Sequence, residues 1–345
     1  MKKVSVIVPC YNAAEYLDRC MEHLLKQTIG TENMEIILID DASTDDGATL
    51  GLLTAYEEKY PDTILVIALE ENMRQGGARN IGISYAGGEY LVFCDADDWL
   101  AYRALEILYR TAVQYDADVV EYRYKVVSDD TETGEEIEQG NGSYLKELWD
   151  EETKRKTLMA STDEFSLGCM RKFYKASLIK DNQIRFAQRL ICEEPSFTLP
   201  VRLYEKVHVF VDAKLYFYLQ THNSTVHRNW DAHKWDNARV WLLLIEDLKE
   251  RGLFECCRAE LECMFYDWGF GLSISMLIQK GYTLTAEEMS FLKDMLLHLF
   301  PDILQNKYVM EKEEEFDRIL KTILKVELTP GNVWGLNQAL KKCPL

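Results

Sequence analysis

Polar and acidic side chains follow three apolar, strand-like stretches of the sequence. They are residues 9–12 (PCYN), residues 40–45 (DDASTD) and residues 95–98 (DADD). Ligands of an open parallel sheet bind beyond the carboxyl ends of its strands. Turns also favour Asp, Asn and Ser, which explains one such strand end without any ligand. Three in one chain favour a shared ligand site.

Asp95 and Asp97 form a D-x-D triplet around one alanine. Alternate residues of an extended segment point the same way, so both carboxylates can face one cation. Mg²⁺ and Mn²⁺ prefer oxygen ligands and commonly bridge carboxylates to substrate phosphates. A D-x-D triplet is common by chance, but this one directly follows an apolar strand. The sequence therefore predicts a Mn²⁺ or Mg²⁺ site here.

Residues 76–80 (GGARN) open a predicted helix. Small residues there allow close approach of the backbone, and free N–H groups together with Arg79 suit an anionic phosphate. The alternative is a tight loop in which Arg79 pairs with an acidic neighbour. No G-x-G-x-x-G follows the first strand and no G-x-x-x-x-G-K-[ST] occurs, which disfavours a dinucleotide site and a Walker-type ATPase.

The strands and helices that position these residues are predicted by alternating strand-like and helix-like patterns. Apolar, β-branched runs predict strands buried on both faces, and apolar residues at helical spacing predict the helices between them. The predicted strands are residues 4–8, 34–39, 64–69, 90–94 and 118–124, and the predicted helices are residues 15–27, 48–60, 76–86 and 103–115. This order requires a largely parallel sheet covered by helices.

The second part of the chain is organised differently. Residues 128–143 are acidic and contain glycine, which predicts an exposed loop. Strand-like patterns return at residues 206–211 and 215–219, and from about residue 230 the sequence is helical, with a capping box at Thr285 and Glu288. We therefore predict one domain over residues 1–226, in two halves (1–100 and 101–226), and a helical domain over residues 227–345.

Composition limits the function classes. The 345 residues carry a formal net charge of −19, which argues against nucleic acid as a partner. No apolar run approaches the ~18 residues of a spanning helix, and the start lacks a signal peptide. Nine scattered cysteines indicate reduced thiols, so we expect a cytoplasmic protein. Aromatic residues of the helical part indicate core packing, with peripheral association at the inner face of the plasma membrane as the alternative.

Four stretches of the chain, taken together, resemble the family 2 glycosyltransferases. These are inverting enzymes of the GT-A fold that use nucleotide-diphosphate sugars. The stretches are VSVIVPCYNAAEYLDRC, EIILIDDASTD, ENMRQGGARNIGISYAGGEYLVFCDADDWL, and RKFYKASLI with EEPSFTLPVRLYEKVHVFVDAKLYFYLQTHNST. The resemblance covers roughly residues 1–226. It implies a GT-A-type, Rossmann-like, mostly parallel sheet flanked by helices, followed by an α-helical C-terminal domain.

The resemblance also implies the donor site. The nucleotide would be bound by Pro9, Tyr11, Asn12, Glu15, Asp40, Asp41, Arg79, Asn80 and Asp95. Among these, a tyrosine face can stack on the base and a carboxylate can accept the uracil imide N–H, so uridine fits. The metal, Mn²⁺ or Mg²⁺, would be held by Asp97, with Asp95 and His222. A UDP-sugar is therefore the expected donor, and a hydroxyl of a glycan or lipid-linked saccharide the expected acceptor.

The catalytic residues implied by the resemblance are Glu194, Glu193 and Asp98. The family typically carries a Glu-Asp pair whose Asp is the base, and Glu194 occupies the position of that Asp. The substitution lengthens the carboxylate's reach, so either glutamate remains a candidate base. Two glutamates at a helix start are also favourable N-terminal charges. Asp98 would line the donor sugar, and Lys172 matches a basic position near the acceptor.

Two other functions stay open. A nucleotidyltransferase would also use a metal, a nucleotide and an α/β sheet, but it would release pyrophosphate. A non-catalytic relative would bind the nucleotide sugar or a carbohydrate without turnover. The absence of a basic, glycine-rich loop after the first strand disfavours the former, and the retained Asp95, Asp97 and Glu194 disfavour the latter.

Overall fold

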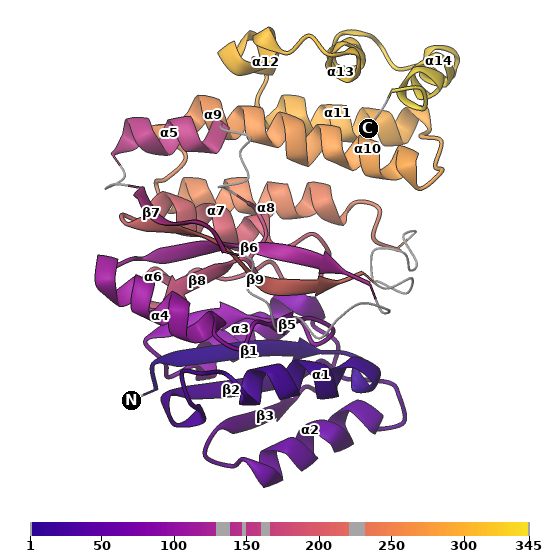
Figure 1. The fold of residues 1–345 in the computed structure, drawn as a ribbon. Helices are drawn as coiled ribbons and strands as arrows, with labels where there is room; N and C mark the ends of the chain where they lie inside the picture. Colours follow the sequence, from indigo (N-terminus) through magenta and orange to yellow (C-terminus); the bar gives the residue numbers. More distant parts are fainter. Residues whose placement is uncertain (1, 129–138, 147–149, 160–165, 221–231, 344–345) are drawn as a thin grey trace. The chain divides into compact units, whose positions relative to one another are not determined.

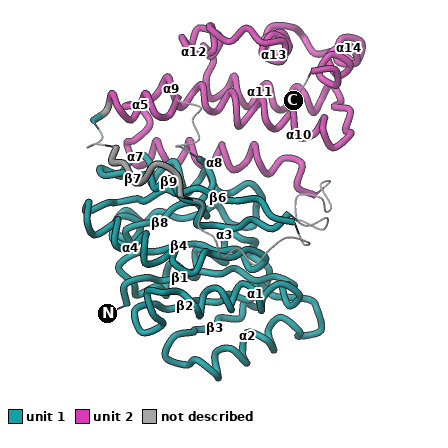
Figure 2. Tube along the Cα trace, viewed as in Figure 1, with its two compact units in different colours: residues 1–150, 162–229 teal, residues 151–161, 230–345 magenta. Residues whose placement is uncertain are grey.

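The structure of the chain is a computed structural model. It describes all residues except 1, 129–138, 147–149, 160–165, 221–231 and 344–345. The chain divides into two compact units, unit 1 with residues 1–150 and 162–229, and unit 2 with residues 151–161 and 230–345 (Figure 2). The second segment of unit 1 ends at residue 229, close to the domain boundary predicted near residue 226. The units differ from the predicted domains in residues 151–161, which group with the C-terminal residues.

The described residues of unit 1 form one nine-stranded sheet with the order β3-β2-β1-β4-β8-β6-β9-β5, and β7 pairs with β9 (Figure 1). The strands are β1 (Val4–Cys10), β2 (Met34–Asp40), β3 (Ile64–Ala68), β4 (Tyr90–Phe93), β5 (Trp99–Leu100), β6 (Val119–Val127), β7 (Gln139–Lys146), β8 (Lys172–Lys175) and β9 (His208–Leu219). The five strands predicted in the N-terminal half are all present.

The sheet is parallel in its first half and mixed in its second. Strands β3, β2, β1 and β4 run parallel, as the βαβα pattern predicts. Strand β8 is antiparallel to β4 and β6, and β5 and β7 are antiparallel to β9. The two strands predicted over residues 206–219 are one continuous strand, β9. Strand β9 pairs with β6 along both predicted segments, and the pairing register shifts on either side of Arg123.

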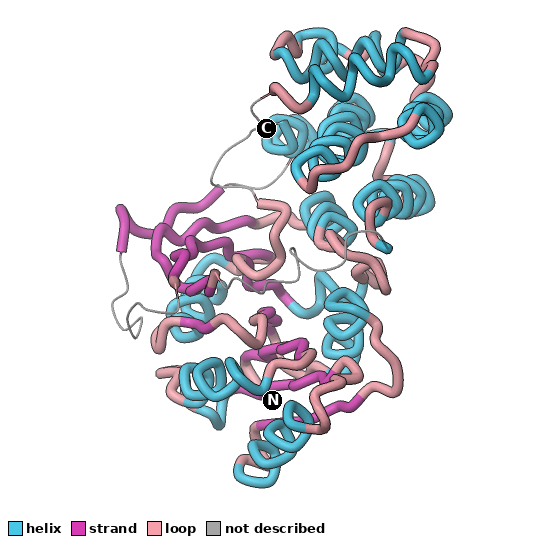
Figure 3. The backbone as a smooth tube through the Cα atoms, turned by 90° about the vertical axis from the view of Figure 1, so that its right-hand side faces the viewer, coloured by secondary structure: helices cyan, strands magenta, loops and turns pink. Residues whose placement is uncertain are grey.

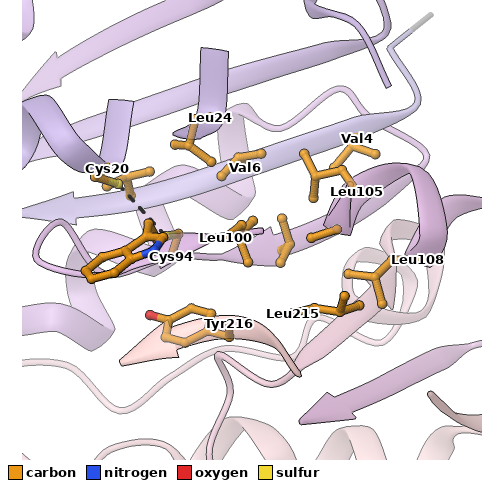
Figure 4. Close-up of a cluster of buried hydrophobic side chains, with 14 of the residues drawn as sticks. Val4, Val6, Cys20, Leu24, Cys94, Leu100, Leu105, Leu108, Leu215 and Tyr216 are labelled. Atoms are coloured by element: carbon orange, nitrogen blue, oxygen red, sulfur yellow. Dashed lines mark hydrogen bonds between the residues drawn. The ribbon is translucent and has the colours of Figure 1, made fainter. Parts of the chain in front are cut away.

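Helices cover both faces of this sheet. They are α1 (Ala14–Leu25), α2 (Ala48–Lys59), α3 (Arg74–Tyr85), α4 (Ala104–Tyr115), α6 (Ala176–Asp181) and α7 (Pro195–Tyr204), and a 3₁₀ turn, η1 (Thr31–Asn33), precedes β2. Alternate strand residues enter two different cores. Val6 and Val8 pack with α1, α2 and α4, whereas Ile7 packs with α3, α6 and α7. Figure 4 shows part of the first core, in which the Sγ atoms of Cys20 and Cys94 lie 3.9 Å apart.

Unit 2 is helical in its described residues (Figure 3). Its elements are α5 (Glu151–Met159), α8 (Asp236–Glu250), η4 (Glu255–Cys257), α9 (Arg258–Met264), the π-helical η5 (Phe265–Gly271), α10 (Leu272–Gln279), α11 (Ala286–Leu299), η6 (Ile303–Gln305), α12 (Lys307–Glu311), α13 (Glu315–Lys325) and α14 (Pro330–Leu340). The capping box predicted at Thr285 and Glu288 is confirmed at the start of α11. Among the described helices, none has the length and apolar character needed to cross a membrane.

Candidate active site

The acidic segment after β4 places three neighbouring aspartates in different surroundings. The side chain of Asp95 is 13% exposed, Asp97 is partly buried, and Asp98 is fully buried. Burial, followed by the nearby charge of Asp95, raises the pKa of Asp97 to about 6. Because like charges resist sharing a buried space, a cation beside Asp95 and Asp97 would be favoured.

Asp98 supports the sheet. Its Oδ2 accepts a hydrogen bond from the Tyr216 hydroxyl at 2.6 Å, and its Oδ1 accepts one from the backbone N–H of Leu219 at 2.8 Å. Burial and the charge of Asp97 raise the pKa of Asp98 to about 9. We expected Asp98 to line the donor sugar, but both of its oxygens bond to strand β9 and no part of it is exposed. In the structure, Asp98 therefore holds strand β9 in place.

Arg79 joins two carboxylates that lie far apart in the sequence. Its Nη2 lies 2.7 Å from Asp95 Oδ1, and its Nη1 lies 2.5 Å from Glu193 Oε1. The side chain is only 1% exposed. We expected Arg79 to support the ribose and diphosphate; the observed contacts correspond to the alternative in which it pairs with acidic residues. It thereby links the segment after β4 to the residues before α7.

Gly76 and Asn80, on the same helix α3, make this close approach possible. A Cβ atom at Gly76 would lie 2.3 Å from the carbonyl oxygen of Ala187 and 2.8 Å from Cγ of Glu193. The Asn80 side chain donates to the carbonyl of Phe186 and accepts from its N–H, both at 2.9 Å. Asn80, predicted to lie at the nucleotide, thus bonds the backbone of Phe186 through both of its side-chain polar atoms. The helix is therefore held tightly against residues 186–193.

The loops that follow β1 and β2 are tied together at the predicted base site. The Asn12 side chain accepts from the Thr44 N–H at 2.7 Å, and the Asn12 N–H donates to the Ser43 hydroxyl at 3.0 Å. That hydroxyl in turn donates to Asp40 Oδ1 at 2.5 Å. Tyr11 remains 47% exposed beside them. An exposed ring next to a buried carboxylate is a suitable arrangement for stacking and hydrogen bonding a base.

Asp41 is held by the segment that precedes α3. Its Oδ1 accepts from the Met73 N–H at 2.6 Å, and its carbonyl accepts from the Asn72 side chain at 3.0 Å. Burial raises its pKa, and the backbone hydrogen bonds oppose that rise. Sequence reasoning missed Asn72 and Met73, because their contact with Asp41 is visible only once β2 and α3 are packed. Pro9 is buried within β1, and Glu15 is exposed at the start of α1.

The two glutamates before α7 differ in exposure. Glu193 is 3% exposed and ion-paired with Arg79, and its burial raises its pKa to about 7 although the Arg79 charge opposes this. Glu194 is more exposed, and its Oε1 accepts a hydrogen bond from the Cys169 N–H at 2.8 Å. Of the two candidate bases, Glu194 therefore has the greater access to solvent.

Three other residues bear on the predicted site. Lys172 is 3% exposed and therefore belongs to the interior, not to an accessible acceptor surface. Leu219, the last residue of β9, is buried and contributes its N–H to Asp98. His222 lies outside the described residues. Within the described part of the chain, no group of three or more His, Cys, Asp or Glu side chains is arranged to hold a metal ion.

Sugar-nucleotide chemistry requires a base pocket, an acidic phosphate and metal site, and a carboxylate on the acceptor side. At the carboxyl edge of the parallel strands lie Tyr11, Asp40, Asp95 and Asp97, and Glu194 lies just before α7. An α/β fold with polar side chains at this edge is the class of protein that binds a ligand beyond its strand ends.

The chain belongs to glycosyl transferase family 2, because the model of that family matches residues 5–178, which is half of the chain. The family expected from the sequence is thereby confirmed.

Curated relatives carry related names. The chain is 30% identical over 217 residues to a poly(ribitol-phosphate) beta-glucosyltransferase of Bacillus spizizenii, covering 62% of this chain and 32% of that protein. It is 30% identical over 231 residues to the poly(ribitol-phosphate) beta-N-acetylglucosaminyltransferase TarP of Staphylococcus aureus, covering 66% of each. The chain thus spans from 32% to 66% of the length of these relatives.

Solved structures share the fold over nearly the whole chain. Residues 1–349 of TarS from S. aureus, crystallised in complex with UDP-GlcNAc, match with a TM-score of 0.71 at 21% identity, covering 98% of this chain and 90% of that one. This match includes the helical C-terminal part. The expected α/β fold with a helical C-terminal region is therefore confirmed.

Proposed function

We propose that this chain transfers a sugar from a UDP-sugar to a hydroxyl group of a glycan or lipid-linked acceptor, by a single displacement that inverts the anomeric centre. The observation that carries the proposal is the Arg79 bridge between Asp95 and Glu193. This bridge brings the metal-ligand candidates and the candidate base segment to one place in unit 1.

The residues present fit a divalent cation. Asp95 and Asp97 offer carboxylate oxygens, and the charge of Asp95 helps to raise the pKa of Asp97, so these two groups repel one another without a cation. Asp97 would be the principal ligand, with Asp95 beside it. When bound, Mn²⁺ or Mg²⁺ would stabilise negative charge that develops on the departing diphosphate.

The remaining chemistry is carried by the chain's own side chains. Tyr11 would stack on the base, and Asp40 would accept the imide N–H of uracil. Glu194 would take the proton from the acceptor hydroxyl as that oxygen attacks the anomeric carbon from the side opposite to the leaving UDP. Cys169 N–H would hold one oxygen of Glu194, leaving Oε2 to receive the proton. Base catalysis of this kind contributes typically about 10²–10⁴-fold.

The names of the relatives suggest which substrates to test first. Two of them are named for transfer of glucose or N-acetylglucosamine to poly(ribitol phosphate). We therefore choose UDP-glucose and UDP-N-acetylglucosamine as donors, and poly(ribitol phosphate) together with neutral glycans as acceptors.

The proposal is tested by measuring UDP release from a panel of nucleotide sugars, with and without acceptor, in the presence of Mn²⁺, Mg²⁺ or EDTA. We expect acceptor-dependent UDP release that EDTA abolishes, and a product of inverted anomeric configuration by NMR. Pyrophosphate release would instead indicate nucleotidyl transfer. UDP-sugar binding without turnover on any acceptor would indicate a binding protein.

Glu194→Gln tests the base assignment. The substitution preserves size and the acceptor for the Cys169 N–H but removes the basic oxygen. We expect transfer to fall at least about 10²-fold while UDP affinity stays unchanged. Transfer at the parental rate would refute the role of Glu194, and the same loss in Glu193→Gln with an active Glu194→Gln would move the role to Glu193.

A further inference from the structure

A short loop, residues 166–169 (SLGC), lies between the candidate base and a buried lysine. Within the loop, the Gly168 N–H donates to the Ser166 hydroxyl at 2.9 Å. The loop is followed after two residues by strand β8, whose first residue is Lys172. Its conformation therefore depends on contacts at both of its ends.

Lys172 holds the backbone of this loop. Its Nζ donates to the carbonyl of Ser166 at 2.5 Å and to the carbonyl of Gly168 at 2.8 Å. The same Nζ lies 3.5 Å from Oε1 of Glu121 on strand β6. That carboxylate also accepts from the Ser166 N–H at 3.1 Å. The buried ammonium group of Lys172 and the carboxylate of Glu121 thus determine where residues 166–168 lie.

The other side of the loop contacts the start of helix α7. The Cys169 N–H donates to Glu194 Oε1 at 2.8 Å, and the Thr198 hydroxyl donates to the Leu167 carbonyl at 2.9 Å. The carbonyl of Glu194 receives further hydrogen bonds from the first turn of α7, including one from the Thr198 hydroxyl at 3.0 Å. A displacement of the loop would therefore move the N–H that orients the Glu194 carboxylate.

Several charged groups act on Lys172. Burial lowers its pKa most, Glu121 opposes this, and Arg171 and Arg202 lower the pKa further, so that the pKa of Lys172 is lowered overall. His208 on β9 also contacts Glu121, with Nε2 lying 3.4 Å from Oε2. A buried ammonium is costly, so its hydrogen bonds to two loop carbonyls are needed to hold it there. An apolar side chain would fill the space without fixing the loop.

We infer that Lys172 is a positioning residue for catalysis: by holding the carbonyls of residues 166 and 168, it fixes the Cys169 N–H that orients the Glu194 carboxylate. The inference rests on the proposed function of Glu194 and adds a residue that itself touches no substrate. It assigns to Lys172 a part in the rate of transfer and none in donor binding.

The test compares Lys172→Met with Lys172→Arg and with Lys175→Met. Lys175 lies on the same strand, partly exposed and paired with the exposed Asp116, so it is the matched control. We expect Lys172→Met to lower kcat about 10²-fold, since a displacement of about 1 Å at a reacting group can have this effect. The KM for the donor and the affinity for UDP should stay within about threefold of the parent, because the donor site is not displaced.

Rescue by the conservative variant separates positioning from a general loss of structure. Lys172→Arg, which retains the charge opposite Glu121, should recover part of kcat, while the KM for the donor and the affinity for UDP stay at the parental values. Lys175→Met should match the parent in both kcat and KM.

Failure of this inference and failure of the proposed function are distinguishable by assaying Glu194→Gln in parallel. If Glu194→Gln is inactive while folded Lys172→Met keeps the parental kcat, the positioning role is refuted. If Glu194→Gln is fully active, the base assignment fails and the positioning role fails with it. If Lys172→Met does not fold, Lys172→Arg decides alone: a parental kcat refutes the role, and a reduced kcat with a parental KM for the donor supports it.

Discussion

Arg79→Met removes the charge that joins Asp95 to Glu193 while keeping an unbranched side chain. In the parent, Arg79 is 1% exposed and makes one ion pair at 2.7 Å and another at 2.5 Å. Asp95 reaches solvent and can recover water when its partner is lost, whereas Glu193 cannot. Because removing one partner of a buried ion pair leaves an uncompensated charge, we expect the free energy of unfolding to fall by about 3–5 kcal/mol at pH 8.

The deficit should depend on pH. Glu193 has a pKa of about 7 in the fold, against 4.5 for an ordinary glutamate, so its protonated form stabilises the fold fully below about pH 4.5. This stabilisation, roughly 3 kcal/mol, is lost as the pH rises through 7. Burial raises this pKa and Arg79 opposes the rise, so Arg79→Met should raise it further. At pH 5.5 Glu193 is protonated in both proteins, and the deficit should shrink by about half or more.

The assay is urea denaturation, followed by circular dichroism and tryptophan fluorescence, at pH 8.0 and pH 5.5. Arg189→Met is the control, because Arg189 is 55% exposed and pairs with an exposed Glu71. We expect its effect to stay within about 0.5 kcal/mol at both pH values. An Arg79→Met deficit below about 1 kcal/mol at pH 8, or an equal deficit at both pH values, would refute the bridge as a source of stability.

Three further predictions concern the same edge of the sheet. Gly76→Ala should destabilise the fold by about 1–3 kcal/mol, measured by denaturation, because the new methyl would meet the carbonyl of Ala187; an unchanged midpoint would contradict this. Asp98→Ala should lower the free energy of unfolding by about 2–4 kcal/mol, because it leaves the Tyr216 hydroxyl and the Leu219 N–H without an acceptor. A variant that is as stable as the parent but inactive would instead indicate that Asp98 acts in the donor site. Asp97→Ala should abolish Mn²⁺-stimulated UDP release and weaken Mn²⁺ binding in calorimetry; retained Mn²⁺ affinity would place the cation elsewhere.

Local sequence patterns were sufficient to predict the strands and helices of the N-terminal half. Runs such as residues 4–8 and 34–39 are apolar on both faces, and this pattern is typical of strands covered by helices on each side. The acidic stretches after β2 and β4 were predicted to lie at strand ends, because polar residues interrupt the apolar pattern there. The family resemblance followed from the spacing of these stretches along the chain.

Tertiary structure decided what each polar residue does. Asp97 and Asp98 are adjacent and identical in type, yet one is partly exposed and the other is buried against Tyr216, 118 residues further along the chain. Arg79 is directed to Glu193, 114 residues away. The antiparallel placement of β8 likewise arises from packing between distant segments.

The sequence by itself determined the class of fold, the family and the two ends of the site, because apolar periodicity and strand-end residues are local properties of the chain. Only the tertiary structure decided which carboxylates stay accessible and which support the sheet, and it alone revealed Lys172 beneath the loop that orients Glu194. Burial and ion pairing depend on side chains brought together from distant positions, and no local pattern records which partner a charged residue will meet.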